Sequence, residues 1–129
     1  MDIKETAVKY HNSGFNCAQS VLATLRDYTG LDEATSLAIA GGLGAGFRCG
    51  EICGAASGGV IAISLAKPYN KEGDADAKDR IAELTKKFTA AFKAECGNIR
   101  CEDIRGKGRT CNDFIVIAAE LAKTVIENN

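Results

Sequence analysis

The stretch ICGAASGGVIAISLA, residues 52–66, is the longest apolar run in the chain and decides the fold class. It carries no charged residue, and it is shorter than the roughly 18 residues that a membrane span requires. Pro68 follows it, and proline disfavours helix in the residue before it. Gly54 and Gly58 lie four positions apart, where they allow another backbone to approach closely. We therefore predict a buried helix that begins near Cys53 and ends before Pro68.

Apolar residues recur at helical spacing on both sides of this stretch, and no segment shows the sustained period-two alternation of a half-buried strand. Capping residues and glycines suggest where the other helices begin and end. These helices are expected from about Ile3 to His11, from Asn16 to Gly30, from Asp32 to the glycines at 41–46, from Asp74 or Asp76 to Gly97, and from Cys111 through Val125. The pattern predicts an all-α fold, a single-domain helical bundle of about five to six helices over the whole chain.

Length and composition limit the classes of function. A chain of 129 residues with 46% hydrophobic residues can build one buried core without crosslinks. The net charge of −1 provides no positive field for phosphate backbones, so we expect no nucleic-acid partner. The polar residues after Met1 do not resemble a secretory signal, which favours a cytoplasmic location, and no membrane span is expected.

The number of cysteines is the feature of the composition that points to a function. The six cysteines are Cys17, Cys49, Cys53, Cys96, Cys101 and Cys111. Reduced cysteines in this number usually bind metal or carry out redox chemistry, although free cysteine also serves as a small buried apolar residue. No Cys-x-x-Cys occurs, which excludes a thioredoxin-type couple and the usual zinc-knuckle half-sites.

Three of the cysteines, Cys17, Cys53 and Cys111, fall in the first turn of a predicted helix, a position that lowers the pKa of a thiol. If consecutive helices alternate in direction, all six cysteines gather at one end of the bundle. The glycines at 41–46 favour close packing there over a phosphate-binding loop. His11 fits a capping or surface residue better than a ligand. The basic residues near the cysteines either offset thiolate charge, attract an anionic partner, or form a solvated loop; they are Arg48, Arg100, Arg105, Lys107 and Arg109.

Three motifs in order carry a resemblance to a known family. NCAQSV at 16–21, GGLG at 41–44 and CGAASG at 53–58, followed by Cys101 and Cys111, resemble the C_GCAxxG_C_C family of suspected redox-active proteins. The resemblance spans about Ala7 to Ala122. It implies a small cytoplasmic helical protein related to a domain of split-Soret cytochromes, in which an iron–sulfur centre has been suspected. The four cysteines of the family then fall on Cys17, Cys53, Cys101 and Cys111, with Cys49 and Cys96 as extra thiols near the same end.

Three hypotheses of function follow. In the first, Cys17, Cys53, Cys101 and Cys111 bind an iron–sulfur cluster, or form a redox-active thiol set, in an electron-transfer protein. In the second, the same residues hold zinc in a helical binding module. In the third, a cysteine pair such as Cys49 with Cys53 acts as a thiol–disulfide oxidoreductase. The expected partner is a redox protein or a small-molecule electron donor or acceptor, and the sequence is compatible with a homodimer.

Overall fold

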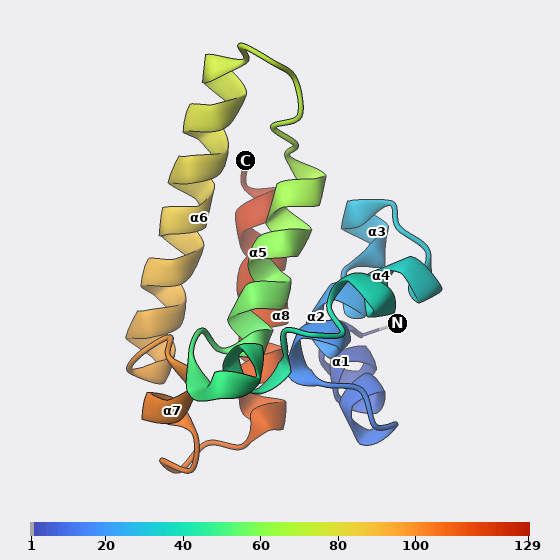
Figure 1. The fold of residues 1–129 in the computed structure, drawn as a ribbon, viewed down its shortest axis with the longest axis vertical. Helices are drawn as coiled ribbons and strands as arrows, with labels where there is room; N and C mark the ends of the chain where they lie inside the picture. Colours follow the sequence, from blue (N-terminus) through green and yellow to red (C-terminus); the bar gives the residue numbers. More distant parts are fainter. Residues whose placement is uncertain (1) are drawn as a thin grey trace.

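A computed structural model describes residues 2–129, and helices dominate it (Figure 1). The six longer helices are α1 (Ile3–Asn12), α2 (Cys17–Thr24), α4 (Glu33–Ile39), α5 (Gly54–Ala66), α6 (Ala75–Cys96) and α8 (Cys111–Glu127). The shorter elements are α3 (Arg26–Thr29), the turn η1 (Gly46–Gly50) and α7 (Cys101–Ile104). Over residues 2–129 the structure has no strand, and its β-pairing is the single bridge between Ile52 and Arg100. The predicted all-α bundle is confirmed, with three short elements added.

Helix α5 lies at the centre of the molecule and packs most extensively against α2 and α8, with α6 on its other side (Figure 1). Two of its glycines explain how close these neighbours come. A Cβ atom added at Gly58 would lie 2.7 Å from the carbonyl oxygen of Ala18 in α2, and one added at Gly59 would lie 2.5 Å from the Phe88 ring in α6. Gly58 therefore makes room for the backbone of α2, as its spacing from Gly54 predicts, and Gly59 makes room for an aromatic ring of α6. Within residues 2–129, none of the helices has the combined length and hydropathy needed to cross a membrane.

The second predicted helix is interrupted. We expected one helix from Asn16 to Gly30, but the structure ends α2 at Thr24 and begins α3 at Arg26. Leu25 leaves the helical conformation at φ −94° and ψ 20°, and Nε of Arg26 donates a hydrogen bond to the Ala23 carbonyl oxygen at 2.9 Å. This side-chain donor takes the place of a backbone partner at the break. Gly30 closes α3 in the left-handed region at φ 76°, as the sequence predicts for the end of this segment.

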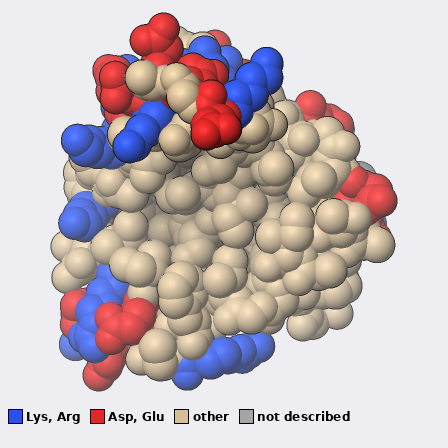
Figure 2. All heavy atoms as spheres, turned by 45° about the horizontal axis from the view of Figure 1, so that its top comes forward, with Lys and Arg blue, Asp and Glu red and all other residues tan. Residues whose placement is uncertain are grey.

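One face of the molecule has few charges. Helix α5 contains no charged residue, and Figure 2 shows a broad, hollowed surface without charged side chains, bordered by acidic and basic groups.

Several large apolar side chains are solvent-exposed, among them Ile39 at 45%, Phe47 at 49% and Ile52 at 39%. Phe47 and Ile52 belong to the segment between α4 and α5, which leads directly to the lower end of the bundle in Figure 1.

That lower end collects the start of α5, the end of α6, the short helix α7 and the start of α8 (Figure 1). Helices α5 and α8 both run upward from it, while α6 runs down toward it. The cysteines at these helix ends are thereby brought to one side of the fold, which is the arrangement that alternating helix directions predict.

The cap of α2 ties this end to the glycine-rich segment. The backbone N–H of Gln19 donates to Oδ1 of Asn16 at 2.9 Å, and Nδ2 of Asn16 donates to the carbonyl oxygen of Gly41 at 3.1 Å.

We expect Asn16→Ala to lower the free energy of unfolding by about 2 kcal/mol, at the upper end for a lost cap, because both bonds disappear. Urea unfolding measures the loss. Asn16→Asp is the control, since it keeps the cap and should lose less; equal stability of Asn16→Ala and the wild type would contradict this role.

Candidate functional site

Four of the six cysteines line one cavity of about 170 Å³ at the lower end of the bundle. Each stands at the start of a different helix. Cys17, Cys101 and Cys111 are the first residues of α2, α7 and α8, and Cys53 is the residue that precedes α5. Three of these positions follow from the sequence, and the short helix α7 adds the fourth. The cavity therefore contains the four cysteines of the family motif.

Backbone pairing brings Cys53 and Cys101 to the cavity together. The N–H of Cys53 donates to the Ile99 carbonyl oxygen at 2.8 Å, and the N–H of Cys101 donates to the Glu51 carbonyl oxygen at 2.6 Å. These two bonds flank the bridge between Ile52 and Arg100. The segment before α5 is thus fixed against the segment before α7, although some fifty positions separate them in the sequence.

The glycine-rich segment closes around these residues. Gly46 lies in the left-handed region at φ 62°, and an added Cβ would lie 2.8 Å from Cβ of Cys101. A Cβ added at Gly44 would lie 2.6 Å from Cβ of Asn16. The close packing predicted for the glycines at 41–46 is confirmed at Gly44 and Gly46, whereas a Cβ added at Gly42 would meet nothing within 4 Å.

Burial and mutual repulsion dominate the electrostatics of the four thiols. Burial, followed by the neighbouring thiols of Cys111, Cys53 and Cys101, raises the pKa of Cys17 from 9.0 to about 12. Burial also raises the pKa of Cys53, against the opposing effect of the backbone N–H groups of Ala56 and Ala55. The expectation that a helix start lowers the thiol pKa is therefore wrong for both residues, because desolvation of the thiolate outweighs the helix end. Both thiols are therefore harder to deprotonate than an exposed cysteine.

The two extra thiols lie outside the cavity lining. Cys96, the last residue of α6, is partly buried and packs against the hydrophobic core that contains Phe88 and Phe92. Cys49 is exposed in the turn η1, and its Sγ donates to the Gly46 carbonyl oxygen at 3.4 Å. All six cysteines are free thiols in this structure. The geometry separates Cys49 and Cys96 from the four cysteines of the motif.

The titration of Cys96 gives a pH prediction. Burial raises its pKa from 9.0 to about 11, with Arg109 opposing and Cys53 adding to the rise. Between pH 9 and 11 the unfolded chain releases this proton while the folded chain keeps it, so the folded state loses stability as the pH rises through that window. We expect the urea midpoint of Cys96→Ser to fall less steeply over this range than that of the wild type. Parallel curves for the two proteins would contradict the assignment.

Other side chains of the cavity were not assigned to it from the sequence. His11 lines the cavity, and its Nδ1 lies 2.7 Å from Oδ1 of Asn112, the residue after Cys111. The short loop between His11 and Cys17 is the one sequence signal that could have placed it there. Arg48 and Arg105 also line the cavity, so two of the five basic residues singled out near the cysteines belong to it.

The arrangement is not a preformed site for a single ion. Over residues 2–129, no group of three or more histidine, cysteine or acidic side chains is arranged to hold a metal ion. The cavity volume of about 170 Å³ is several times the roughly 30 Å³ that a water molecule occupies in the liquid. Its space therefore suits a group of several atoms.

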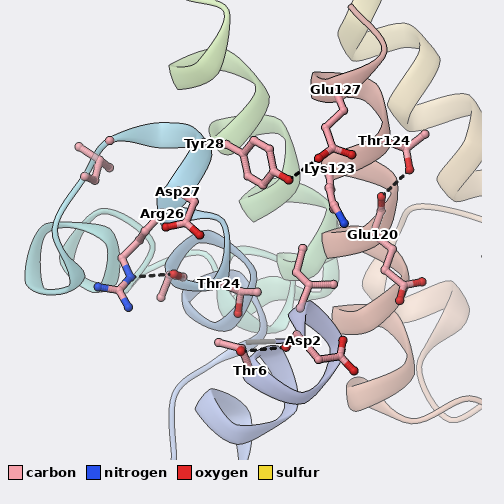
Figure 3. Close-up of a pocket in the computed structure, with 14 residues that line it drawn as sticks. Asp2, Thr6, Thr24, Arg26, Asp27, Tyr28, Glu120, Lys123, Thr124 and Glu127 are labelled. Carbon is pink, nitrogen blue, oxygen red and sulfur yellow. Dashed lines mark hydrogen bonds between the residues drawn. The ribbon is translucent and has the colours of Figure 1, made fainter.

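A larger hollow of about 980 Å³ lies between α1, α3 and α8, away from the cysteines (Figure 3). Neither cysteine nor histidine is among its lining residues. Two hydrogen bonds within its lining are those from the hydroxyl of Tyr28 to Glu127, at 2.6 Å, and from Oγ1 of Thr124 to the Glu120 carbonyl oxygen, at 2.9 Å. We place the candidate site at the smaller cavity because it holds the reactive side chains.

One of the comparisons with known proteins found a match. A family model described as "Putative redox-active protein (C_GCAxxG_C_C)" matches residues 15–125, which include all six cysteines. The comparisons with curated proteins and with solved structures found no match.

Proposed function

This chain belongs to the C_GCAxxG_C_C family of redox-active proteins, and from that premise we propose that Cys17, Cys53, Cys101 and Cys111 bind an iron–sulfur cluster in an electron-transfer protein. The observation that carries the proposal is the convergence of these four cysteines, from four helix starts, on one cavity. Cys49 and Cys96 are left out of the ligand set because they do not line that cavity.

The residues present fit such a group. Cysteine thiolates are the usual ligands of iron–sulfur clusters, and soft sulfur ligands select these centres, zinc or copper over harder cations. The cavity offers space for several atoms rather than for one. Unpaired backbone N–H groups at the starts of helices favour negative charge, so the four positions also suit the charge of bound thiolates.

The residues of the cavity would stabilise the thiolate ligands, control their protonation and limit the access of water. The Ala55 and Ala56 N–H groups hydrogen-bond Cys53 and stabilise its thiolate. Because burial and the neighbouring thiols raise the pKa of Cys17, its thiolate would need positive charge in the cavity in order to form near neutral pH. Ile104 and Phe114 are buried side chains of the cavity wall and limit its contact with water. When bound, a cluster at this position would supply one-electron transfer.

Anaerobic purification followed by iron and acid-labile sulfide analysis tests the proposal. We expect iron and sulfide in stoichiometric amounts and visible absorption that bleaches on reduction. A colourless protein that contains neither element overturns the proposal. Stoichiometric zinc would instead favour the binding module, and a metal-free protein whose thiol count changes reversibly with reductant would favour thiol–disulfide exchange.

A further inference from the structure

Two arginines line the cysteine cavity, and they differ from the neighbouring arginines in whether they form ion pairs with carboxylates. Arg100 lies within 3.3 Å of three carboxylates, those of Glu51, Glu102 and Asp103. Arg109 pairs with Glu95 at 3.8 Å. By contrast, Arg48 and Arg105 line the cavity, and within residues 2–129 neither forms an ion pair with a carboxylate.

The rest of the cavity does not neutralise them. Its lining contains no aspartate and no glutamate. The cavity therefore has two positive charges, contributed by separate segments: Arg48 belongs to η1, and Arg105 follows α7.

Both arginines are exposed, whereas Cys53 is buried. Their guanidinium groups are thus accessible to solutes that enter the cavity from solvent. The planar fork of a guanidinium matches the oxygens of carboxylates, phosphates and other oxyanions, and a cationic cleft raises the local concentration of anions.

We propose that Arg48 and Arg105 form an anion-binding entrance to the cysteine cavity. The reactant that reaches these thiols, or a cluster bound by them, would then be a small oxygen-bearing anion. The inference rests on the proposed function for its significance, since it names the substrate class of that same site. It concerns binding and approach, and it applies to the reduced thiols themselves.

Alkylation with a charged and a neutral reagent tests it. Iodoacetate and iodoacetamide react with the same thiolate, so the ratio of their rates at one cysteine reports the local potential and not the thiol pKa. The probe is Cys111, the exposed cysteine of the cavity, and its alkylation is followed by mass spectrometry in the reduced, intact 129-residue chain at low ionic strength. The ratio at the same cysteine in urea is the reference.

In the wild type we expect folding to raise the iodoacetate-to-iodoacetamide ratio by roughly tenfold, and sulfate to suppress this gain more than chloride does at equal ionic strength. The double variant Arg48→Gln, Arg105→Gln should lose the gain. A matched double variant, Arg80→Gln with Lys86→Gln, removes the same charge from exposed positions of α6 and should keep it.

The inference is overturned if the folded wild type shows no gain, or if both double variants lose it equally. Unfolding midpoints of the variants verify that each remains folded, and Arg48→Lys with Arg105→Lys should recover most of the gain because it restores the charge. Iron and sulfide analysis plays no part in this measurement, so a failure of the cluster proposal and a failure of the anion entrance are separately visible.

Discussion

Serine in place of any one of Cys17, Cys53, Cys101 or Cys111 is expected to reduce bound iron and sulfide to background. Each of these thiols lines the same cavity, and a serine hydroxyl neither ionises near neutral pH nor offers the soft sulfur that iron–sulfur centres require. Iron and sulfide per chain, measured after anaerobic purification, give the result directly.

The two extra cysteines provide matched controls. Cys49→Ser and Cys96→Ser make the same chemical change outside the cavity lining and should keep iron and sulfide at the wild-type level. Circular dichroism of every variant verifies the helical content, so that loss of the centre is not confused with loss of the fold. Full retention in Cys111→Ser, or complete loss in Cys49→Ser, would contradict the four-cysteine set.

The helices and their caps could be predicted from the sequence because they depend on local patterns. Asn16, Asp32 and Asp74 cap α2, α4 and α6 through their side chains, and each stands where the sequence indicates a helix start. Helix α7 could not be predicted in this way. It has four residues, and its position depends on the pairing of Cys101 with Glu51, a contact between distant segments that periodicity does not reveal.

The predicted lowering of the thiol pKa is wrong in sign for Cys17 and Cys53, and for Cys17 the magnitudes explain why. A helix end contributes about 1 kcal/mol to a charged group in the first turn. The rise of the Cys17 pKa from 9.0 to about 12 corresponds to about 4 kcal/mol in the opposite direction. Helix position can be read from one sequence, but burial and the number of neighbouring thiols are tertiary properties.

The turn before Cys49 is a second feature that local rules do not predict. Ala45, Phe47 and Arg48 have φ values of 51°, 60° and 61°, in the left-handed region that favours glycine. Each such residue costs about 1–2 kcal/mol. The bond from the Glu51 N–H to the Gly46 carbonyl oxygen, at 2.9 Å, helps to hold this conformation, which brings Arg48 to the cavity.

Gly58→Ala is expected to lower the free energy of unfolding by about 2 kcal/mol, although alanine is the better helix former. The added methyl group would lie 2.7 Å from the carbonyl oxygen and 3.2 Å from Cα of Ala18. Both are backbone atoms, so no side-chain rotation relieves the contact and α2 must move away from α5. Gly58→Val should cost more, about 3 kcal/mol, because overpacking adds to the same separation.

Gly42→Ala is the matched control for this substitution. A Cβ at Gly42 meets nothing within 4 Å, and its backbone is outside the left-handed region, so the same change should stay within about 0.5 kcal/mol of the wild type. Urea unfolding of the three variants gives the comparison. If Gly58→Ala matched Gly42→Ala, the close approach of α2 and α5 would not contribute to stability.

The same substitution connects packing to the site. Helix α2 begins at Cys17 and α5 follows directly after Cys53, so a shift of one helix against the other changes the spacing of two sulfurs of the cavity. We therefore expect Gly58→Ala to retain less iron and sulfide than Gly42→Ala, even under conditions in which both variants are fully folded. Equal retention would mean that the cavity tolerates a displacement of α2, and that the close contact at Gly58 serves stability alone.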